Sequence, residues 1–191
     1  MEQIKELTKR LIANSFKELM LQMPFEKITI KMITDHANVI RPTFYNHFHD
    51  KYELLEWILQ NEILDKAVEC FNRDDGSKAI KLIISGIYED RDFYRKAFEV
   101  AGQNGFAETL LANLSAIFKK TPGVQSINGD DAKAKQELVS RYYASGLITV
   151  IHFVIFDAGD MKIDDIIMLY KHLASHTVYD VLTVNKSHEE T

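Results

Sequence analysis

The sequence is poor in the residues that cross-link or interrupt a chain. Its 191 residues include one cysteine, three prolines and eight glycines. Because Cys70 has no second cysteine to pair with, an internal disulfide is excluded, and a reducing, cytoplasmic setting is expected. The scarcity of proline and glycine favours long helices over a turn-rich β-fold. No membrane span is expected, because the longest apolar run, residues 146–156, is far shorter than the ~20 residues that a span needs.

An excess of positive charge, which is typical of nucleic-acid-binding proteins, is also missing from the chain as a whole. The net charge is −5, yet it is unevenly distributed. Residues 1–51 contain eight Lys/Arg and six Asp/Glu, a balance of +2, which leaves a balance of −7 for residues 52–191. The sequence therefore indicates a mildly basic head and an acidic body. A balance of +2 is weak support for DNA binding without a motif beside it.

Apolar residues recur every three to four positions along most of the chain, which is the pattern of amphipathic helices. No segment alternates convincingly as a half-buried strand does. The sequence therefore predicts an all-α protein of about nine helices. The expected helices are 4–22, 30–37, 42–48, 51–71, 77–88, 92–101, 106–120, 131–156 and 164–182.

Two domains are expected from this pattern. Residues 1–50 are predicted to form a three-helix head that contains a helix-turn-helix. Residues 51–191 are predicted to form a helical bundle for effector binding and dimerisation. The long helix 51–71 begins beside the head and ends among the body helices, so it is expected to join the two.

Local capping signals set the expected helix bounds in the head. Thr29 is suited to cap the second helix, because its hydroxyl accepts a hydrogen bond from a free N–H of the first turn. Asn38 adopts a left-handed backbone readily and is expected to end that helix. Proline belongs in a first helical turn and disfavours a helical residue before it. We therefore expect the third helix to begin at Pro42, with Arg41 just outside it.

Two phenylalanines four residues apart divide the third helix into an inner and an outer face. Phe44 and Phe48 are expected to point into a small core. The other faces then carry Thr43, Tyr45, Asn46 and His47. Asp50 comes next and is expected to cap the fourth helix.

Nine positions in this region match a known signature. They are Thr29, Ile33, Ala37, Val39, Thr43, Tyr45, Phe48, Lys51 and Leu54. Over residues 5–55 the chain resembles TetR-family transcriptional regulators. It departs from the family at Asn38, which replaces the usual turn glycine, and at Ile40, which replaces the small hydroxyl residue that caps the recognition helix. Residues 37–55, 92–106 and 142–151 are similar to the family's dihydroxyacetone kinase regulator subgroup.

The resemblance implies that the third helix lies in the major groove of double-stranded DNA. The implied DNA-binding residues are Thr29, Arg41, Pro42, Thr43, Tyr45, Asn46, His47 and Lys51. Arg41, Thr43 and Asn46 are expected to reach base edges or nearby phosphates. Thr29, Tyr45, His47 and Lys51 are expected to contact phosphates, which set the register of the complex. The alternatives are that Tyr45 packs in the small core, that His47 is simply solvated and that Lys51 is an ordinary surface lysine.

The aromatic residues of the body allow either a packed core or a pocket between helices. A pocket would be apolar with a few polar groups that orient an effector. The candidate lining residues are Trp57, Tyr94, Phe98, Phe106, Tyr142, Tyr143 and His152. For His152, which lies in an apolar helix, a satisfied core position is the default and a ligand contact is the alternative. The effector is expected to be a small molecule or a co-regulator protein.

The last two predicted helices carry apolar stripes with little internal partner. The first contains Leu138, Tyr142, Leu147, Val150 and Ile151, and the second contains Ile166, Ile167, Leu169, Tyr170, Leu173, Val178 and Val181. Paired with the same helices of a second copy, they would form a four-helix bundle, as in the family's usual dimer. A homodimer is therefore expected, with a palindromic operator.

No grouping of residues indicates an enzyme, a cofactor or a metal site. His172 and His176 are four residues apart, but no zinc-protease sequence surrounds them. Asp157, Asp160, Asp164 and Asp165 are better explained by helix capping. The leading hypothesis is a DNA-binding regulator, with repression by the effector-free dimer as the family expectation. In the narrower subgroup, activation with a protein partner is the alternative. A sensor or adaptor whose head has lost DNA binding is the second hypothesis, and a helical enzyme has no supporting motif.

Overall fold

The structure, a computed structural model, describes residues 2–73, 75–102 and 105–176, and no strand occurs within these ranges. The elements of the N-terminal part are α1 (Glu2–Gln22), the short 3-10 helix η1 (Phe25–Lys27), α2 (Ile30–His36), α3 (Arg41–Tyr45), α4 (Lys51–Leu59), the π-helical turn η2 (Gln60–Leu64) and α5 (Asp65–Asn72). The remaining helices are α6 (Gly76–Glu89), α7 (Arg91–Phe98), α8 (Phe106–Lys119), α9 (Pro122–Gln125), α10 (Ala132–Phe156) and α11 (Ile163–Ser175). The predicted all-α class is confirmed.

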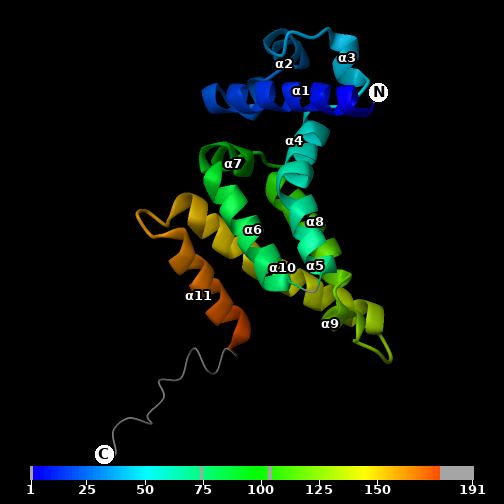
Figure 1. Cartoon of the computed structure of the whole chain (residues 1–191), viewed down its shortest axis with the longest axis vertical. Coiled ribbons are helices and arrows are strands. Elements are labelled where there is room, and N and C mark those ends of the chain that lie inside the picture. The colour runs from blue at the N-terminus through cyan, green and yellow to red at the C-terminus, as the bar shows by residue number, and fades with distance from the viewer. Residues whose placement is uncertain (1, 74, 103–104, 177–191) are drawn as a thin grey trace, which may run out of the picture.

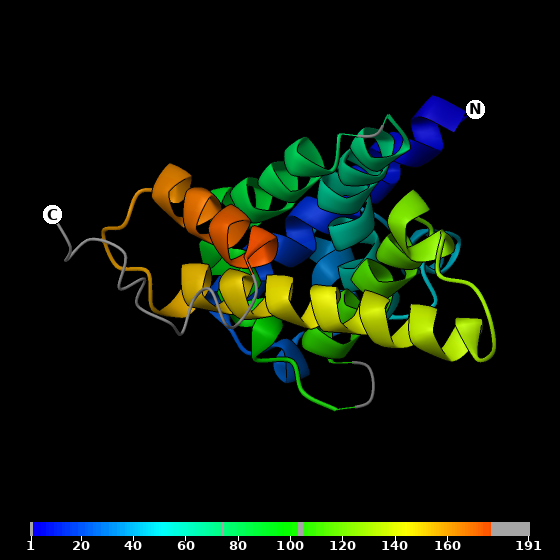
Figure 2. The same ribbon diagram turned by 90° about the horizontal axis from the view of Figure 1, so that it is seen from below.

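The head, consisting of α1, α2 and α3, lies at one end of the molecule (Figure 1). From there α4, η2 and α5 run as one continuous helical segment into the body, which is built from α6 to α11. Within the body, α10 packs mainly along α8, and α11 packs against both α6 and α10. Figure 2 shows α10 running the length of the body with α11 beside it.

One continuous apolar core joins the head to the body. It extends from Phe16 in α1, through Leu55 and Ile58 in α4, to Ile151 in α10 and Ile166 in α11. The domain boundary at residue 50 therefore remains a prediction, because the buried contacts run across it. The apolar stripe predicted for the first helix is buried only in part: Ile4, Leu7 and Leu11 are exposed.

The long helix predicted over 51–71 is interrupted by a π-helical turn. At this turn Asp65 donates its backbone N–H to the carbonyl of Gln60, five residues earlier. Such a turn inserts one extra residue and rotates the helix beyond it, and it occurs frequently at functional sites. Nothing in the 3.6-residue periodicity marks it, since side chains on both sides of the turn remain buried.

Several predicted helix ends differ from the structure. The third helix begins at Arg41 rather than at Pro42: Ile40, with an extended backbone (φ −82°, ψ 150°), occupies the N-cap position, and Pro42 stands in the first turn, where its missing N–H costs no helical hydrogen bond. That helix ends at Tyr45 rather than residue 48. The sixth predicted helix begins at Arg91 and ends at Phe98. The loop predicted over 121–129 contains α9, which begins at Pro122.

The N-terminus of α10 also differs from expectation. Either Asp130 or Asp131 is predicted from the sequence to cap this helix. Asp131 occupies the N-cap position with a left-handed backbone (φ 61°), and its side chain accepts no capping hydrogen bond. The predicted end of the last helix at Leu182, with Val178 and Val181, lies outside the described residues.

Among the residues that the structure describes, α10 alone is long and apolar enough to cross a membrane by length and composition. Its most apolar 18-residue window has a mean hydropathy of 1.4. A core helix of a soluble protein passes the same test, and six side chains of α10 are buried. Composition is therefore weak support for a membrane span here.

Candidate nucleic-acid interface

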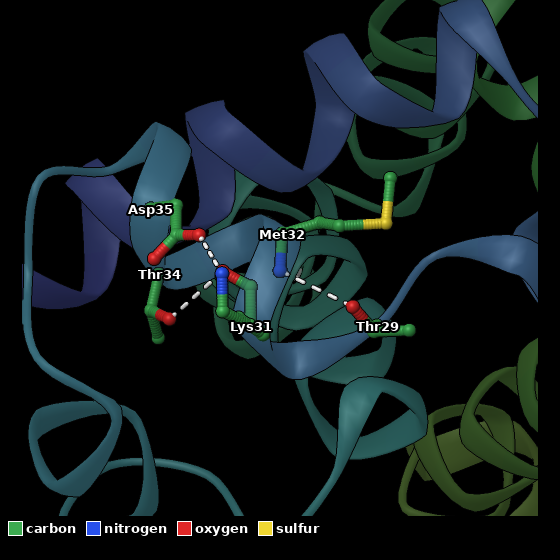
Figure 3. Close-up of polar contacts among 5 residues, drawn as sticks. All are labelled: Thr29, Lys31, Met32, Thr34 and Asp35. Carbon is green, nitrogen blue, oxygen red and sulfur yellow. Dashed lines mark hydrogen bonds and ion pairs between the residues drawn. The ribbon is translucent and has the colours of Figure 1, made fainter.

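The start of α2 is fixed by Thr29, as its sequence position predicts. Its hydroxyl oxygen accepts a hydrogen bond from the backbone N–H of Met32 at 3.2 Å (Figure 3). The hydroxyl proton remains available for an outside acceptor. On the same helix Lys31 Nζ pairs with Asp35 at 2.8 Å, and the buried Thr34 donates to the Lys31 carbonyl. The Lys31–Asp35 pair is exposed, so it contributes little to the stability of α2.

The turn between α2 and α3 depends on Asn38, which has a φ of 53°. The left-handed backbone region is costly for most residues but accessible to asparagine. The Val39 N–H then donates to the Thr34 carbonyl at 2.9 Å, which closes the turn. The prediction that Asn38 adopts the left-handed backbone usually taken by glycine is therefore confirmed.

Helix α3 is anchored by aromatic side chains and exposes its polar ones. Phe44 and Phe48 are buried, and the Phe48 ring lies 5.7 Å from that of Trp57 on α4. The exposed residues are Arg41, Pro42, Tyr45 and Asn46, and Thr43 and His47 are half-buried. Ile40, at the N-cap position, makes no side-chain capping bond and is 70% exposed. A single rigid turn thus presents the predicted DNA-contacting side chains to solvent.

Tyr45 is half exposed rather than packed in the small core. Its side chain is 49% exposed, and its ring meets Phe44 edge-on at 5.6 Å. Arg41 Nη2 donates to the Tyr45 hydroxyl at 3.2 Å, and the guanidinium lies over the tyrosine ring. The two side chains are therefore preorganised as a pair on the outer face of α3.

Lys51 has its ammonium turned toward the protein. Nζ donates to the carbonyls of Phe25 at 2.6 Å, Ile28 at 2.9 Å and Glu26 at 3.4 Å. It also lies 4.2 Å from the centre of the Phe25 ring. Burial lowers the pKa of Lys51, and the carboxylate of Glu26 partly opposes this. Because an ammonium has three N–H donors, a phosphate contact by Lys51 would require one of these carbonyls to be released.

His47 lies beside the N-terminal half of α1. Burial lowers its pKa, and the positive charges of Lys9 and Lys5 lower it further. The neutral form of the imidazole is therefore favoured. In that form it offers a phosphate one N–H donor and no positive charge.

Comparisons with known proteins agree with this geometry. A sequence profile of the bacterial regulatory proteins of the tetR family matches residues 17–58. Over 146 residues the chain is 30% identical to the HTH-type dhaKLM operon transcriptional activator DhaS of Lactococcus lactis subsp. lactis (strain IL1403). That match spans 75% of this chain and 77% of DhaS. The chain belongs to the TetR family.

It is accordingly a DNA-binding transcriptional regulator, and the resemblance drawn from its sequence is confirmed. The solved structure of a dihydroxyacetone kinase operon activator DhaS covers 87% of this TetR-family chain, and the match covers 92% of that structure, with a TM-score of 0.59 and 23% identity. A Clostridium perfringens putative fatty acid metabolism regulator matches with a TM-score of 0.53 and 17% identity, over 83% of this chain and 93% of its own. At these identities the solved structures support the fold alone.

In the body of this TetR-family regulator, the predicted pocket residues do not form one site. Tyr94, Phe98, Phe106 and His152 meet through ring contacts of 5.1–6.0 Å. Trp57 belongs to the core of the head, against Phe48. Tyr142 and Tyr143 lie on an exposed face of α10. The expectation that His152 is a buried core residue is wrong: its side chain is 56% exposed, because it lies on the outer side of α10.

An open hollow of about 500 Å³ lies instead at the far end of the body. Its lining residues are apolar or uncharged: Phe71, Gly76, Ile80, Phe118, Thr121, Gly123, Val124, Val139, Tyr143 and Tyr170. Of these, the sequence predicts Tyr143 alone. The sequence places Tyr170 in the apolar stripe predicted for the dimer interface. The apolar pattern of that helix does not indicate that Tyr170 also lines a hollow. Burial raises the pKa of Tyr170, and the nearby Tyr143 adds to this.

Within the described ranges, no three His, Cys, Asp or Glu side chains are grouped as metal ligands. The rings of His172 and His176 stack at 3.9 Å, and His176 Nδ1 lies 2.8 Å from the His172 carbonyl oxygen.

Proposed function

We propose that this regulator works as a homodimer that reads a palindromic operator with α3 of each copy and responds to an effector held by the body. The observation that carries the proposal is the division of α3 into a buried aromatic side and an exposed polar side. Phe44 and Phe48 fix the helix, while Arg41, Tyr45 and Asn46 face solvent. Such a helix suits entry into a major groove. Binding to chromosomal DNA would place the protein in the cytoplasm.

Four residues of the predicted dimer stripes, Leu147, Ile151, Ile166 and Ile167, are instead buried within the chain. The apolar side chains that remain exposed on α10 and α11 support dimerisation. Leu138 and Tyr142 on α10 are 70% and 71% exposed, and Met168 on α11 is 62% exposed. Contiguous exposed apolar side chains on a monomer mark interaction surfaces. A second copy related by a two-fold axis would cover this face with the same face, as closed dimers do.

The hollow at the far end of the body supports a small-molecule effector. Because its lining carries no charged side chain, the expected effector is neutral and mostly apolar. The hydroxyl of Tyr170, like any tyrosine hydroxyl, is protonated at neutral pH, and burial raises its pKa further, so it can donate a hydrogen bond to an effector oxygen. A co-regulator protein remains the other candidate for control of the body, and the Phe98–His152 cluster remains a second candidate contact region.

The sign of regulation has two candidates. The family resemblance favours repression by the effector-free dimer. The name of the Lactococcus lactis relative describes an activator of the dhaKLM operon. A reporter fused to the chain's own promoter region, measured with and without the intact gene, separates the two outcomes.

Equilibrium binding to DNA tests the core of the proposal. Fluorescence anisotropy with DNA from the chain's own promoter region, against a shuffled duplex, should give sequence-specific binding. Replacing Asn46 with alanine should cost ~1–3 kcal/mol at one base position if this side chain reads a base. The matched control Asn113→Ala alters a body asparagine that hydrogen-bonds Glu56, and should leave discrimination unchanged. No binding to any duplex at low salt would instead favour the sensor or adaptor hypothesis.

A further inference from the structure

Lys17, in the middle of α1, belongs to the head but is directed at the body. Its side chain is only 19% exposed. Nζ lies 2.7 Å from a carboxylate oxygen of Glu62 and 2.5 Å from one of Asp90. It also lies 5.1 Å from the centre of the Phe93 ring in α7. One ammonium therefore contacts the helix that links head and body, and also the start of α7 in the body.

Both carboxylates are committed to this contact. Asp90 occupies the N-cap position of α7, where an aspartate normally accepts a backbone N–H, yet its side chain makes no capping bond. Glu62 lies in the π-helical turn η2. The adjacent Ile63 packs so closely on α6 that a Cβ added at Gly86 would lie 2.5 Å from its Cδ1. The π-helical turn is thus held from the head by Lys17 and from the body by α6.

We propose that Lys17 is a positioning residue: by holding Glu62 and Asp90 together, it sets the angle of the head on the body and hence the separation of the two recognition helices. The inference rests on the dimer of the proposed function. Figure 1 shows α7 and α3 on opposite sides of α1. The contact of Lys17 with Glu62 and Asp90 is called the joint below. A small rotation of α1 about this joint displaces α3. Loss of the ammonium would also leave two carboxylates facing one another without a counter-charge, which favours their separation.

Helix α7, whose N-cap residue is Asp90, also carries a buried tyrosine hydroxyl. The Tyr94 hydroxyl is fully buried and has no hydrogen-bond partner among the described residues. Burial raises the pKa of Tyr94, and the negative charges of Glu62 and Asp90 raise it further. Because this hydroxyl has an unused donor, it is a candidate partner for a carboxylate that Lys17 releases, and such an alternative pairing is what a two-state element requires.

Pulsed electron–electron double resonance on the full-length chain tests the proposal directly. A spin label at Asp35→Cys, in a Cys70→Ser background, reports the distance between the two heads of a dimer. The parent protein should give one narrow distance distribution. Lys17→Met should broaden or shift it by ~2 Å or more, the size of helix shifts in switching proteins. Lys17→Arg, which can bridge the same two carboxylates, should restore the narrow distribution.

The matched control is Lys119→Met, which breaks a 2.8 Å lysine–glutamate pair between α8 and α10 within the body. It should leave the head-to-head distance unchanged. An unchanged distance in Lys17→Met would overturn the proposal. An absence of dipolar signal in the parent would instead mean that the dimer itself is wrong, so the two failures are distinguishable. If Lys17→Met does not fold, Asp90→Asn removes one charge of the joint with little change of shape and should broaden the distribution to a smaller extent.

DNA binding supplies the second readout. Against duplexes in which two half-sites are moved apart one base pair at a time, the parent should prefer one spacing by roughly tenfold or more, equivalent to ~1.4 kcal/mol. Lys17→Met should lose most of that preference while keeping its choice of bases within each half-site. A merely destabilised head would weaken binding at every spacing by the same factor, and that result would count against a positioning role.

Discussion

Two lysines of the N-terminal region differ from the lysines that form ion pairs in the body. Lys17 in α1 and Lys51 at the start of α4 both turn inward, one to carboxylates and the other to backbone carbonyls, although the head also contains an exposed pair, Lys31–Asp35. In the body, the pairs Lys81–Asp164 and Lys119–Glu137 lie on the surface, where such pairs contribute little to stability. The balance of +2 over residues 1–51 therefore overstates the charge that the head can offer to phosphates. Net charge locates the DNA-binding end of this chain but does not identify the contacts.

The burial of apolar side chains differs between α3 and the last two helices. The aromatic side of α3 is fully enclosed by the head, whereas α10 and α11 leave large apolar side chains in solvent. The aromatic side chains of the recognition helix are therefore buried within one chain, although Ile4, Leu7 and Leu11 of α1 are exposed. The proposed dimer would cover the exposed side chains of α10 and α11.

The largest effect is expected from the core of the head. Phe44→Ala removes a fully buried ring and should lower the free energy of unfolding by ~3–5 kcal/mol. Urea unfolding followed by circular dichroism measures it. Because the core is continuous, one transition is expected. Two separate transitions would show that head and body are independent units, as the predicted boundary at residue 50 implies.

A change on the exposed face of the body should act on association rather than folding. Met168→Glu places a charge in the proposed dimer surface, where a buried apolar side chain contributes ~1.5–3 kcal/mol. The dimer should dissociate at concentrations at which the parent is dimeric, as measured by sedimentation. Lys171→Glu, on the same helix, adds the same side chain outside the apolar set and serves as the control. A dimer that resists Met168→Glu would assign the interface elsewhere.

Replacing Lys51 distinguishes a structural role of its ammonium from a contact with a DNA phosphate. Lys51→Met removes a charged donor from the carbonyls of Phe25 and Ile28, and should lower stability by ~1–3 kcal/mol. If the ammonium stays on these carbonyls in the complex, the dependence of DNA affinity on salt should keep its slope. A slope reduced by ~1 would restore the phosphate contact that the family resemblance implies.

The missing cap of α3 gives a smaller, stabilising prediction. Ile40 has an extended backbone that suits an N-cap residue, so Ile40→Ser should stabilise the head by ~0.5–1 kcal/mol. Thr29→Ala removes the corresponding bond on α2 and should destabilise by a similar amount. Thermal unfolding of both variants measures the pair. A neutral Ile40→Ser would mean that the free N–H groups of α3 are well satisfied by water.

The smallest effect concerns protonation of His47. Its pKa is lowered by burial and by Lys9 and Lys5, so the folded state binds fewer protons than the unfolded state. The stability from the neutral ring is present above the unfolded pKa of ~6.5 and is lost as pH falls through the folded value. Lys9→Gln should raise the pKa of His47, as followed by NMR titration. An unchanged pKa would remove Lys9 from the causes and leave burial and Lys5.

The features that are predictable from sequence are those that depend on neighbouring residues. Thr29 and Asp50 cap their helices through backbone groups two or three residues away. Asn38 ends α2 because its own backbone tolerates a left-handed conformation. The alternation of Phe44 and Phe48 with polar residues likewise predicts which side of α3 faces solvent. Each of these signals is complete within a short stretch of sequence.

By itself, then, the sequence determined the helical class, the helix-turn-helix and the residues exposed on α3. The tertiary structure decided where long side chains point. Lys17 and Lys51 reach groups 23 to 73 residues away in the chain, and the hollow of the body is lined from six helices and one residue that flanks α9. The π-helical turn was likewise invisible to periodicity. Flexible side chains and distant walls are placed by packing between segments, and no short-range pattern encodes that packing.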